Sequence, residues 1–434
     1  MSQKLDFKVE SLGKCTIDSP LNIEYFVDDS QRVLYEISLD SFARDRKLKT
    51  PPLSMEVAGP RKKIYFDPSK TKAGIVTCGG LCPGINDVIR GMVNLLWYGY
   101  GVRNIFGFRY GYQGLAPQYK HEVWDLTPEK VVGIHKRGGS ILASSRGPQD
   151  TGVMVDALER MNVNILFTIG GDGTQKGALD MHAEARKRNI NLSVIGIPKT
   201  IDNDLSFIEK SFGFETAFSA AVESIRGAHE EAEGAPNGVG IVKLMGRHSG
   251  FIASMATLAM SDVNFCLIPE IPFTLEGENG LFKAMDKRLK ARRHAVIVVA
   301  EGAGQEIMAR KAGEWDTDPS GNVKLNDIGV FLRDELAAHF KLLGTEINIK
   351  YIDPSYIIRS VPANPTDSVY CMQLAQNAVH AGMAGKSGMV VGEWNNTFAN
   401  LPIAMAVLRR NTVDPKGPLW VNVLESTGQP PDMS

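Results

Sequence analysis

Short apolar runs alternate with stretches of helical periodicity along the chain from residue 73 onward. The apolar runs occupy residues 73–78, 102–108, 164–169, 192–197, 240–245 and 295–300. Apolar residues recur at helical spacing over residues 85–97, 175–188, 249–260 and 281–292. Continuous apolar strands separated by helices are typical of parallel sheets covered on both faces. The runs are too many for one small doubly wound unit, so we expect an α/β fold of two stacked doubly wound (Rossmann-like) domains, with the active site between them.

Residues 1–72 depart from this pattern. They are rich in charge, contain the turn signal Thr50-Pro51-Pro52 and include the basic stretch Arg61-Lys62-Lys63. Short alternating pieces such as residues 33–37 allow one or two strands. We interpret the segment as an N-terminal extension packed on the main body, and a partly ordered arm is the alternative.

Composition and charge exclude several classes of protein. Of the 434 residues, 43% are hydrophobic and 22% are charged, as in ordinary globular proteins and unlike fibrous or disordered chains. The formal net charge of −1 gives no electrostatic reason to expect nucleic acid or a membrane as a partner. Five scattered cysteines favour a reducing compartment, and no apolar run approaches the ~18 residues of a transmembrane helix. Residues 1–10 show no signal peptide, so we expect a cytoplasmic location.

Glycine and charged residues collect where the predicted strands end. These ends read GGLCPG (79–84), SSRGP (144–148), GGDGT (170–174), PKTIDND (198–204), MGRHSG (245–250) and AEGAG (300–304). In open α/β sheets, ligands bind beyond the carboxyl ends of the strands. If the strands are neighbours, we expect these loops to converge on one site.

Two of these loops join a strand to a helix and suit anions. In residues 170–174, two glycines, a carboxylate and a hydroxyl at a helix N-terminus suit phosphate and Mg²⁺, with Asp172 as the metal ligand. A helix cap formed by Asp172 or Thr174 is the structural alternative. Residues 79–84 are either a second anion site or a tight turn. Because residues 88–121 contain no Asp or Glu, a nicotinamide-dependent oxidoreductase is disfavoured.

Carboxylates and arginines supply the candidate chemistry of the remaining loops. Asp202 and Asp204 share a face of an extended segment, and two nearby carboxylates have their pKa values pushed apart, which leaves one to act as a base. An Asx-turn is the structural alternative. Arg146, Arg247 and Arg359 are candidate phosphate clamps, because a guanidinium group binds phosphate in a bidentate manner, and ordinary surface arginines are the alternative.

Other patterns are not assigned a function. Residues 382–387 resemble the end of a Walker A loop, but the required first glycine is replaced by His380 and a helical pattern precedes the segment. Cys78 and Cys82 lack a second pair at zinc-like spacing. The acidic run at 230–233 and the basic run at 287–294 are expected on solvated helix faces.

Taken together, four segments in this order and spacing resemble the 6-phosphofructokinase family. They are GGLCPGINDVIR (79–90), GGDGTQKGA (170–178), PKTIDND (198–204) and MGR (245–247). The resemblance covers roughly residues 73–425. Gly59-Pro60-Arg61, residues 250–260 and residues 350–359 are most similar to the branch that holds plant and trypanosomatid ATP-dependent enzymes and their bacterial relatives. The resemblance implies transfer of a phosphoryl group from ATP to the C1 hydroxyl of fructose 6-phosphate, giving fructose 1,6-bisphosphate in glycolysis.

The resemblance also implies roles for particular residues. Asp202 would accept the hydroxyl proton, assisted by Arg146, Lys199 and Thr200, and Asp172 would hold Mg²⁺. The residues expected around the donor phosphates are Gly80, Arg146, Gly147, Gly171, Asp172, Gly173 and Thr174. The residues expected to bind the sugar phosphate are Thr200, Ile201, Asp202, Met245, Gly246, Arg247, Glu301, Lys350, Tyr356 and Arg359. Lys350 aligns with an arginine that reaches in from the adjacent subunit in simpler relatives, and Tyr356 stands where those relatives have histidine.

Two positions bear on the phosphoryl donor. Pyrophosphate-using relatives usually carry aspartate at the position of Gly173, where a carboxylate would crowd and repel the α-phosphate of ATP. They also carry lysine at the position of Lys199, as do the plant and trypanosomatid ATP enzymes. We therefore predict ATP as the donor, with a pyrophosphate-dependent phosphotransferase as the alternative. A catalytically silent regulatory subunit is disfavoured because Asp172, Asp202 and Arg247 are intact.

The family's architecture implies the domain bounds. We expect an N-terminal extension at 1–72, a donor domain at 73–214 with about 358–405, and a sugar-phosphate domain at 215–357 with about 406–434. A homotetramer, or at least a homodimer, is expected, since Lys350 would act across subunits. Effector behaviour stays open, because the allosteric arginines of simpler bacterial enzymes have no counterparts near Pro236-Asn237-Gly238.

Overall fold

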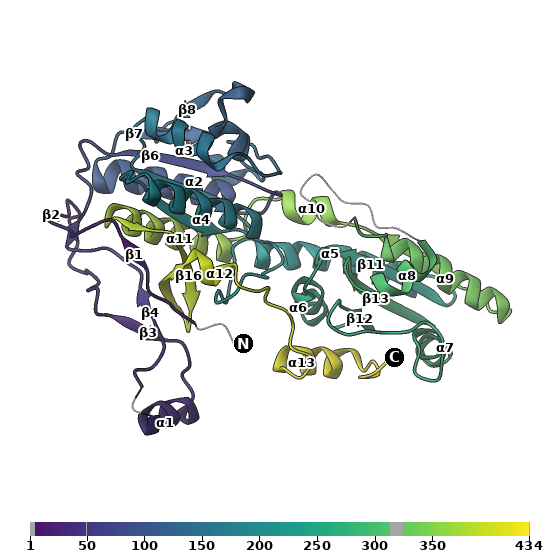
Figure 1. Ribbon diagram of the computed structural model, residues 1–434. Helices are drawn as coiled ribbons and strands as arrows, with labels where there is room; N and C mark the ends of the chain where they lie inside the picture. Colours follow the sequence, from purple (N-terminus) through teal and green to yellow (C-terminus); the bar gives the residue numbers. More distant parts are fainter. Residues whose placement is uncertain (1–4, 49, 313–323, 434) are drawn as a thin grey trace. The chain divides into compact units, whose positions relative to one another are not determined.

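The computed structural model describes residues 5–48, 50–312 and 324–433 (Figure 1). The chain divides into two compact units. Unit 1 comprises residues 1–200, 205–213 and 361–409, and unit 2 comprises residues 201–204, 214–360 and 410–434.

Unit 1 is built on a nine-stranded sheet of order β3-β4-β17-β16-β10-β9-β6-β7-β8. The strands are β3 (Arg32–Leu34), β4 (Ser54–Val57), β17 (Thr397–Pro402), β16 (Met389–Trp394), β10 (Ser193–Pro198), β9 (Ile165–Gly170), β6 (Lys72–Thr77), β7 (Asn104–Phe108) and β8 (Val123–Asp125). The five strands from β16 to β7 run parallel, and the flanking pairs are antiparallel. Two short ladders lie outside this sheet, β1 (Glu10–Ser11) with β15 (Lys386–Ser387) and β2 (Ile17–Asp18) with β5 (Lys63–Ile64).

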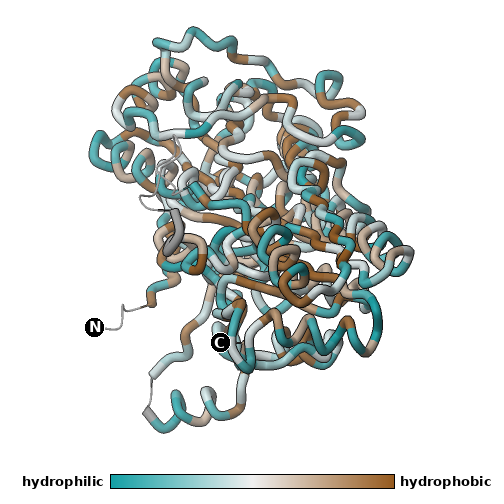
Figure 2. The backbone as a smooth tube through the Cα atoms, turned by 90° about the vertical axis from the view of Figure 1, so that its right-hand side faces the viewer, coloured by the Kyte–Doolittle hydropathy of each residue, from teal (hydrophilic) through white to brown (hydrophobic). Residues whose placement is uncertain are grey.

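The helices of unit 1 pack in pairs. The helices are α1 (Leu39–Leu48), α2 (Ile85–Asn94) with a π-helical continuation (Leu95–Tyr100), α3 (Thr151–Arg160), α4 (Asp172–Lys187), α11 (Pro365–Met383) and α12 (Ile403–Ala406), with 3-10 turns at Gly111–Leu115, Pro117–Tyr119 and Ile134–Lys136. α2 packs on α11, and α3 packs on α4. In Figure 2 much of the hydrophobic (brown) tube lies inside the fold, whereas α1 is largely hydrophilic (teal).

The crossovers of unit 1 diverge at its centre. The β6–α2–β7 crossover runs toward the β8 edge of the sheet, and the β9–α4–β10 crossover runs toward the β3 edge. Because parallel crossovers are right-handed, opposite directions place α2 and α4 on opposite faces of the sheet. The loops after β6 and β9 therefore flank a topological switch point, which is where ligands bind in open α/β sheets.

Unit 2 has a parallel four-stranded sheet of order β12-β13-β11-β14. Its strands are β11 (Gly238–Leu244), β12 (Phe265–Leu267), β13 (His294–Ala300) and β14 (Asn348–Ile352). Its helices are α5 (Phe214–Glu233), α6 (Phe251–Ala259), α7 (Leu281–Arg292), α8 (Gln305–Ala312), α9 (Ile328–Leu342), α10 (Ser355–Ser360) and α13 (Pro418–Thr427). Buried side chains of α7 and α9, such as Met285 and Leu336, belong to one hydrophobic cluster with Val239 and Ile241 of β11. The crossover from β11 passes β13 and the crossover from β13 passes β11, so a second switch point lies at the carboxyl ends of these two strands.

The apolar pattern located the inner strands well. The six predicted runs correspond to β6, β7, β9, β10, β11 and β13 and confirm those predictions. The helix expected at 175–188 begins earlier, at Asp172, and Gly171 is its N-cap. The basic run at 287–294 does not lie wholly on a helix face, since His294 begins β13.

Part of the N-terminal segment is an integral layer of unit 1. β4 pairs with β17, β3 pairs with β4, and the Ala58 N–H donates to the Phe398 carbonyl at 2.8 Å. The expectation that this segment packs on the main body is confirmed for β3 and β4. α1 stands away from the sheet on its own loop (Figure 1), with Leu39 largely exposed.

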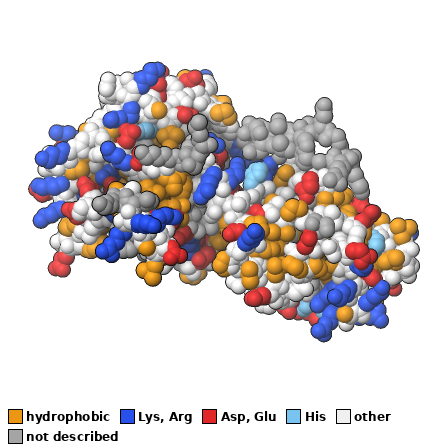
Figure 3. Space-filling model, turned by 60° about the horizontal axis from the view of Figure 1, so that its bottom comes forward, with side chains coloured by type: hydrophobic (Ala, Val, Ile, Leu, Met, Phe, Trp, Pro, Cys, Tyr) orange, Lys and Arg blue, Asp and Glu red, His pale blue; other side chains and the backbone are white. Residues whose placement is uncertain are grey.

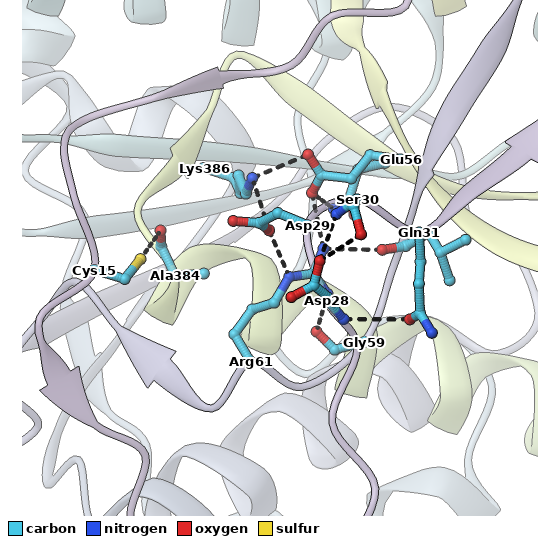
Figure 4. A network of polar contacts seen from close by, with 12 residues as sticks. Cys15, Asp28, Asp29, Ser30, Gln31, Glu56, Gly59, Arg61, Ala384 and Lys386 are labelled. Atoms are coloured by element: carbon cyan, nitrogen blue, oxygen red, sulfur yellow. Dashed lines mark hydrogen bonds and ion pairs between the residues drawn. The ribbon is translucent and has the colours of Figure 1, made fainter.

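A buried ion network fastens this segment to the rest of unit 1 (Figure 4). Arg61 contacts Glu56 at 2.9 Å and Asp29 at 2.8 Å, and Lys386 contacts Glu56 at 2.9 Å. The Asn400 amide donates to the same Glu56 carboxylate at 2.8 Å. Lys386, Glu56 and Arg61 are all buried. The lysine of the Walker-like segment is therefore engaged in a structural ion network, which agrees with leaving that segment unassigned.

Removing one cation from this network should destabilise the protein. In Lys386→Met, the buried Glu56 carboxylate keeps only one of its two cationic partners, and breaking a buried pair costs about 3 kcal/mol or more of unfolding free energy. Urea unfolding measures the difference. Lys70→Met is the matched control, because its ion pair with Asp67 is exposed and such pairs contribute about 0–1 kcal/mol. Equal stability of the two variants would contradict the role given to Lys386.

Candidate active site

In unit 1, short hydrogen bonds join the loop after β6 to the segment 143–145. The Thr77 hydroxyl donates to the Ala143 carbonyl at 2.6 Å, and the Ser144 hydroxyl donates to the Gly79 carbonyl at 2.6 Å. The Gly79 N–H donates to the Ser145 carbonyl at 3.0 Å. The structure thus brings the segment that carries Arg146 and Gly147 beside the segment that carries Gly79 and Gly80. Arg146 is exposed, as a phosphate clamp requires.

Lys199 braces three of these loops. Its side chain is buried, and its amine donates to the Gly80 carbonyl at 2.7 Å. Its backbone N–H donates to the Gly170 carbonyl at 3.0 Å. Lys199 therefore joins the segments that follow β6, β9 and β10, and it holds a positive charge next to the glycine loop.

The segment 170–174 opens α4. Gly171 is the N-cap, and no side chain caps the helix. The alternative in which Asp172 or Thr174 caps the helix is therefore wrong. Thr174 is instead buried against Gly170, where an added Cβ would come within 2.1 Å of its hydroxyl oxygen. The first turn of α4 presents backbone N–H groups and the positive end of the helix dipole, which favour an anion.

Gly173 lies in open space at this helix end. A Cβ placed on Gly173 would meet no atom within 4 Å, whereas a Cβ on Gly171 would lie 3.2 Å from the Lys199 carbonyl oxygen. Glycine at 173 is thus not demanded by packing. A side chain at this position would project into the space beside the helix N-terminus, so packing does not restrict the residue type here.

Asp172 fits the coordination chemistry of magnesium. Its carboxylate is partly exposed at the start of α4 and pairs with Lys176 at 2.8 Å. Mg²⁺ is usually held by one or two carboxylates, with phosphate oxygens and water completing the octahedron. Lys176 is more exposed than Asp172, so it can withdraw when a cation takes its place.

In unit 2, the loops after β11 and β13 interlock through their backbones. The Glu301 N–H donates to the Leu244 carbonyl at 2.9 Å, and the Gly302 N–H donates to the Gly246 carbonyl at 3.1 Å. A Cβ at Gly302 would lie 2.0 Å from the Arg247 carbonyl oxygen, so only glycine permits this approach. The structure therefore brings Met245, Gly246 and Arg247 together with Glu301.

Asp202 joins this group. The Ser249 hydroxyl donates to the Asp202 carbonyl at 3.1 Å, and Arg410 contacts the Asp204 carboxylate at 3.0 Å. Thr200 is the residue after which the chain passes from unit 1 to unit 2 at Ile201. The short segment 198–204 therefore carries Lys199 in one unit and both carboxylates in the other.

The carboxylates of this group perturb one another. Burial, together with the negative charges of Asp204 and Glu301, raises the pKa of Asp202 to about 8 against the opposing charges of Arg410 and Arg247. Burial also raises the pKa of Glu301, against the charges of Arg247 and Lys243. An acid whose pKa lies near neutrality is suited to exchange a proton at physiological pH.

Tyr356 and Arg359 lie on α10, which follows β14. The Arg359 guanidinium carbon stands 4.7 Å from the centre of the Tyr356 ring. Arg359 is also among the charges that lower the pKa of Glu301, which places it within electrostatic reach of the group around Arg247. The Tyr356 side chain is 74% exposed, so it is available to a ligand.

Lys350 is not brought to this group within the chain. It lies on β14 opposite Gly240 of β11, five residues before Met245, and it pairs with Glu231 of α5 at 3.8 Å. At about 3.3 Å per residue, this separation exceeds the reach of one lysine side chain. Any contribution of Lys350 to the site would have to come from another copy.

The sequence reasoning missed an ion cluster beside Glu301. Lys243 is nearly buried and contacts Asp327 at 2.8 Å and Asp353 at 2.9 Å, and the Tyr351 hydroxyl donates to Asp327 at 2.9 Å. A lysine inside the apolar run at 240–245 was the available signal. The cluster fixes the carboxyl ends of β11 and β14, which carry the candidate site residues.

The two units define an α/β protein whose strand-end loops are of the kind that binds phosphate. Comparison with known proteins specifies the class further. The family model described as Phosphofructokinase matches residues 72–382. The chain is 49% identical over 445 residues to a protein of Borreliella burgdorferi named ATP-dependent 6-phosphofructokinase, covering all of this chain and 98% of that protein. It is 47% identical to a Trypanosoma cruzi protein of the same name, covering 87% of this chain and 77% of that protein.

The chain belongs to the phosphofructokinase family. Plant and trypanosomatid members are among its relatives, which confirms the branch that the sequence resembled. A solved pyrophosphate-dependent phosphofructokinase from Marinobacter aquaeolei shares the fold, with a TM-score of 0.68, 19% identity, and coverage of 82% of this chain and 91% of that one. Within the described residues, no helix has the length and apolar character needed to cross a membrane.

Replacing Asp202 by a neutral residue should make the protein more stable than the wild type at high pH. An acid whose pKa is raised by folding keeps its proton in the native state, so the stability it contributes at low pH is lost between about pH 4 and pH 8. Asp202→Asn removes this loss. We expect its melting temperature to exceed that of the wild type by several degrees at pH 8 and to approach it at pH 5. Asp262→Asn, at an exposed position, is the control. If Asp202→Asn melted at the wild-type temperature at both pH values, the raised pKa of Asp202 in the folded protein would be contradicted.

Proposed function

We propose that the chain is an ATP-dependent 6-phosphofructokinase of glycolysis. It transfers the γ-phosphoryl group of ATP to the C1 hydroxyl of fructose 6-phosphate and releases fructose 1,6-bisphosphate and ADP. The single observation that carries this proposal is the grouping of Asp202, Arg247 and Glu301 at one switch point. The open space at Gly173, at the start of α4, supports ATP as the donor. The near full-length identity to relatives with this name supports it.

Unit 1 supplies the donor side of the proposed reaction. Backbone N–H groups at Gly171, Gly173 and Thr174 suit phosphate oxygens, and Gly80, Gly147 and Arg146 come from the loops tied to them. When bound, Mg²⁺ offsets the negative charge of the phosphoryl group in transfer, and Asp172 is its proposed protein ligand. Lys199 keeps the donor loops in register through its bond to Gly80.

Unit 2 supplies the acceptor side. Arg247 and Arg359 are the proposed partners of the sugar 6-phosphate, with Met245, Gly246, Glu301 and Tyr356 contacting the sugar. Asp202 is the proposed base. Only the ionised Asp202 carboxylate can take the C1 proton as the new phosphorus–oxygen bond forms and the bond to ADP breaks, and its raised pKa makes that carboxylate a stronger proton acceptor. Thr200 and Ile201 lie on either side of the point where the chain passes from unit 1 to unit 2.

We propose a donor domain of residues 73–214 with about 358–405 and a sugar-phosphate domain of residues 215–357 with about 406–434, preceded by the extension at 1–72. The two compact units differ from these bounds, because residues 201–204 belong to unit 2 and the extension belongs to unit 1. Cysteine usage supports a cytoplasmic location.

We also propose that the enzyme acts as a homo-oligomer, most simply a tetramer. Lys350 lies too far along β14 to join the sugar site of its own chain, so a partner copy is needed for it to act on substrate. Exposed apolar residues around α1, including Ile37 and Leu39, suit contact with such a copy. Charges of both signs are interspersed on the face shown in Figure 3, as suits self-association without strong repulsion.

A donor assay tests the function directly. With fructose 6-phosphate and Mg²⁺, we expect turnover with ATP and little with pyrophosphate, measured by coupling fructose 1,6-bisphosphate to aldolase. Asp202→Asn should lower kcat by about 10²–10⁴-fold while retaining sugar-phosphate binding, because loss of one proton-transfer group typically costs this much. Turnover with pyrophosphate alone would overturn ATP as donor, and wild-type kcat in Asp202→Asn would remove it as base.

A negative charge at position 173 should weaken the binding of ATP as the donor. The space around its Cα admits a side chain, so Gly173→Asp and Gly173→Ala are both expected to fold with wild-type melting temperatures. Gly173→Asp should raise KM for ATP by about tenfold or more, since a like charge beside a phosphate costs over 1 kcal/mol. Gly173→Ala adds bulk without charge and should change KM much less. Equal effects of the two variants would show that volume, and not charge, controls the donor.

A further inference from the structure

A cluster of metal-ligating side chains lies at the end of unit 2 opposite the candidate active site. His229 and Glu233 are one turn apart on α5, and His294 is the first residue of β13. His294 pairs in register with Gly238 at the start of β11, whereas Arg247 and Glu301 follow the far ends of these strands. Seven residues of strand separate the two ends by roughly 20 Å. The cluster therefore does not belong to the phosphoryl-transfer site.

The three ligand atoms converge. The Glu233 carboxylate oxygen lies 3.8 Å from Nε2 of His229 and 3.8 Å from Nε2 of His294, and all three atoms lie within 4.8 Å of one another. The two imidazole rings meet edge to face with centroids 5.4 Å apart. Metal–ligand bonds of about 2.0–2.1 Å in a tetrahedral site place the ligand atoms about 3.3–3.4 Å apart. Each histidine nitrogen would therefore approach the Glu233 oxygen by roughly 0.5 Å, and the two histidine nitrogens would approach each other by at most about 1.5 Å.

The hydrogen bonds around His294 leave the correct nitrogen for a metal. Its Nδ1 lies 3.1 Å from the Arg292 carbonyl oxygen, and since that oxygen can only accept, Nδ1 carries the proton. Nε2 then offers a lone pair toward Glu233 and His229. A histidine held in this way by a backbone carbonyl is the usual support of a metal-binding imidazole. The backbone is fixed as well, because the Arg288 guanidinium donates to the His294 carbonyl at 3.1 Å.

We propose that His229, Glu233 and His294 form a binding site for a divalent first-row transition metal, such as Zn²⁺, Co²⁺ or Ni²⁺. Two imidazoles and one carboxylate are a borderline donor set that suits these ions better than Mg²⁺ or Ca²⁺. The site lies at the surface, with the Glu233 side chain 52% exposed, so an ion has an entry path and water can complete its coordination. A bound ion would join the last turn of α5 to the first residue of β13.

The site explains two charge runs that the sequence left without a function. Glu233 belongs to the acidic run at 230–233 and His294 ends the basic run at 287–294, and both were expected on solvated helix faces. The fold brings one member of each run together with His229. No local spacing in the sequence joins residues 233 and 294.

Metal titration tests the proposal without reference to catalysis. The full-length protein is stripped with a chelator and titrated with Co²⁺ in excess Mg²⁺, which occupies carboxylate sites. We expect one Co²⁺ per chain, visible absorption bands without a sulfur charge-transfer band, and a rise in melting temperature. Glu233→Gln should weaken Co²⁺ binding by about tenfold or more, and His294→Ala should do the same.

Glu230→Gln is the matched control. Glu230 is exposed on the same helix, and its substitution removes the same charge as Glu233→Gln. It should bind Co²⁺ as the wild type does. Since Glu233 is half exposed, Glu233→Gln should keep the wild-type fold, which circular dichroism checks. Wild-type affinity in Glu233→Gln and His294→Ala, or an equal loss in Glu230→Gln, would overturn the site. Because binding is read by spectroscopy, this outcome is independent of whether the chain transfers phosphoryl groups.

Discussion

Neighbouring parallel strands whose crossovers run in opposite directions impose the central constraint on this protein. Where the crossovers from two neighbouring strands leave in opposite directions, a crevice that can hold a ligand forms beyond the carboxyl ends of those strands. The constraint appears at β6 and β9 in unit 1, and again at β11 and β13 in unit 2. The loops that follow these strands must satisfy their own backbone groups while leaving room for a ligand. Glycine meets both needs, as the contacts of Gly170 and Gly302 show.

Such loops need support from outside the site. In unit 1 the support is Lys199, whose amine and backbone N–H reach two different glycine loops. In unit 2 it is Lys243, which is nearly buried between Asp327 and Asp353. Both lysines extend from strand ends, where a long side chain can reach neighbouring loops while its stem stays packed. Each unit thus positions its candidate site with one well-buried cation.

The acids at the proposed sugar site are held at the expense of stability. Asp202, Asp204 and Glu301 are close enough for burial and mutual repulsion to raise the pKa of Asp202 to about 8. The positive charges of Arg410 and Arg247 oppose this repulsion. A strained set of charges of this kind is common at functional sites, because the groups are arranged for a ligand and not for the free protein. In the proposed reaction, the 6-phosphate of the sugar would pair with arginines such as Arg247, and the proton of the C1 hydroxyl would pass to the Asp202 carboxylate.

The sequence by itself determined the six inner strands, the loops that end them and the family, because buried strands and glycine turns leave local patterns that do not depend on distant residues. It did not determine which groups the Lys386 and Lys199 amines contact, that α4 begins at Asp172 without a side-chain cap, or that β3 and β4 extend the sheet of unit 1. Nor could it join Glu233 to His294, or show that Lys350 faces Glu231. Only the tertiary structure decided these points, since strand register and helix packing bring together side chains whose separation along the chain carries no periodic signal.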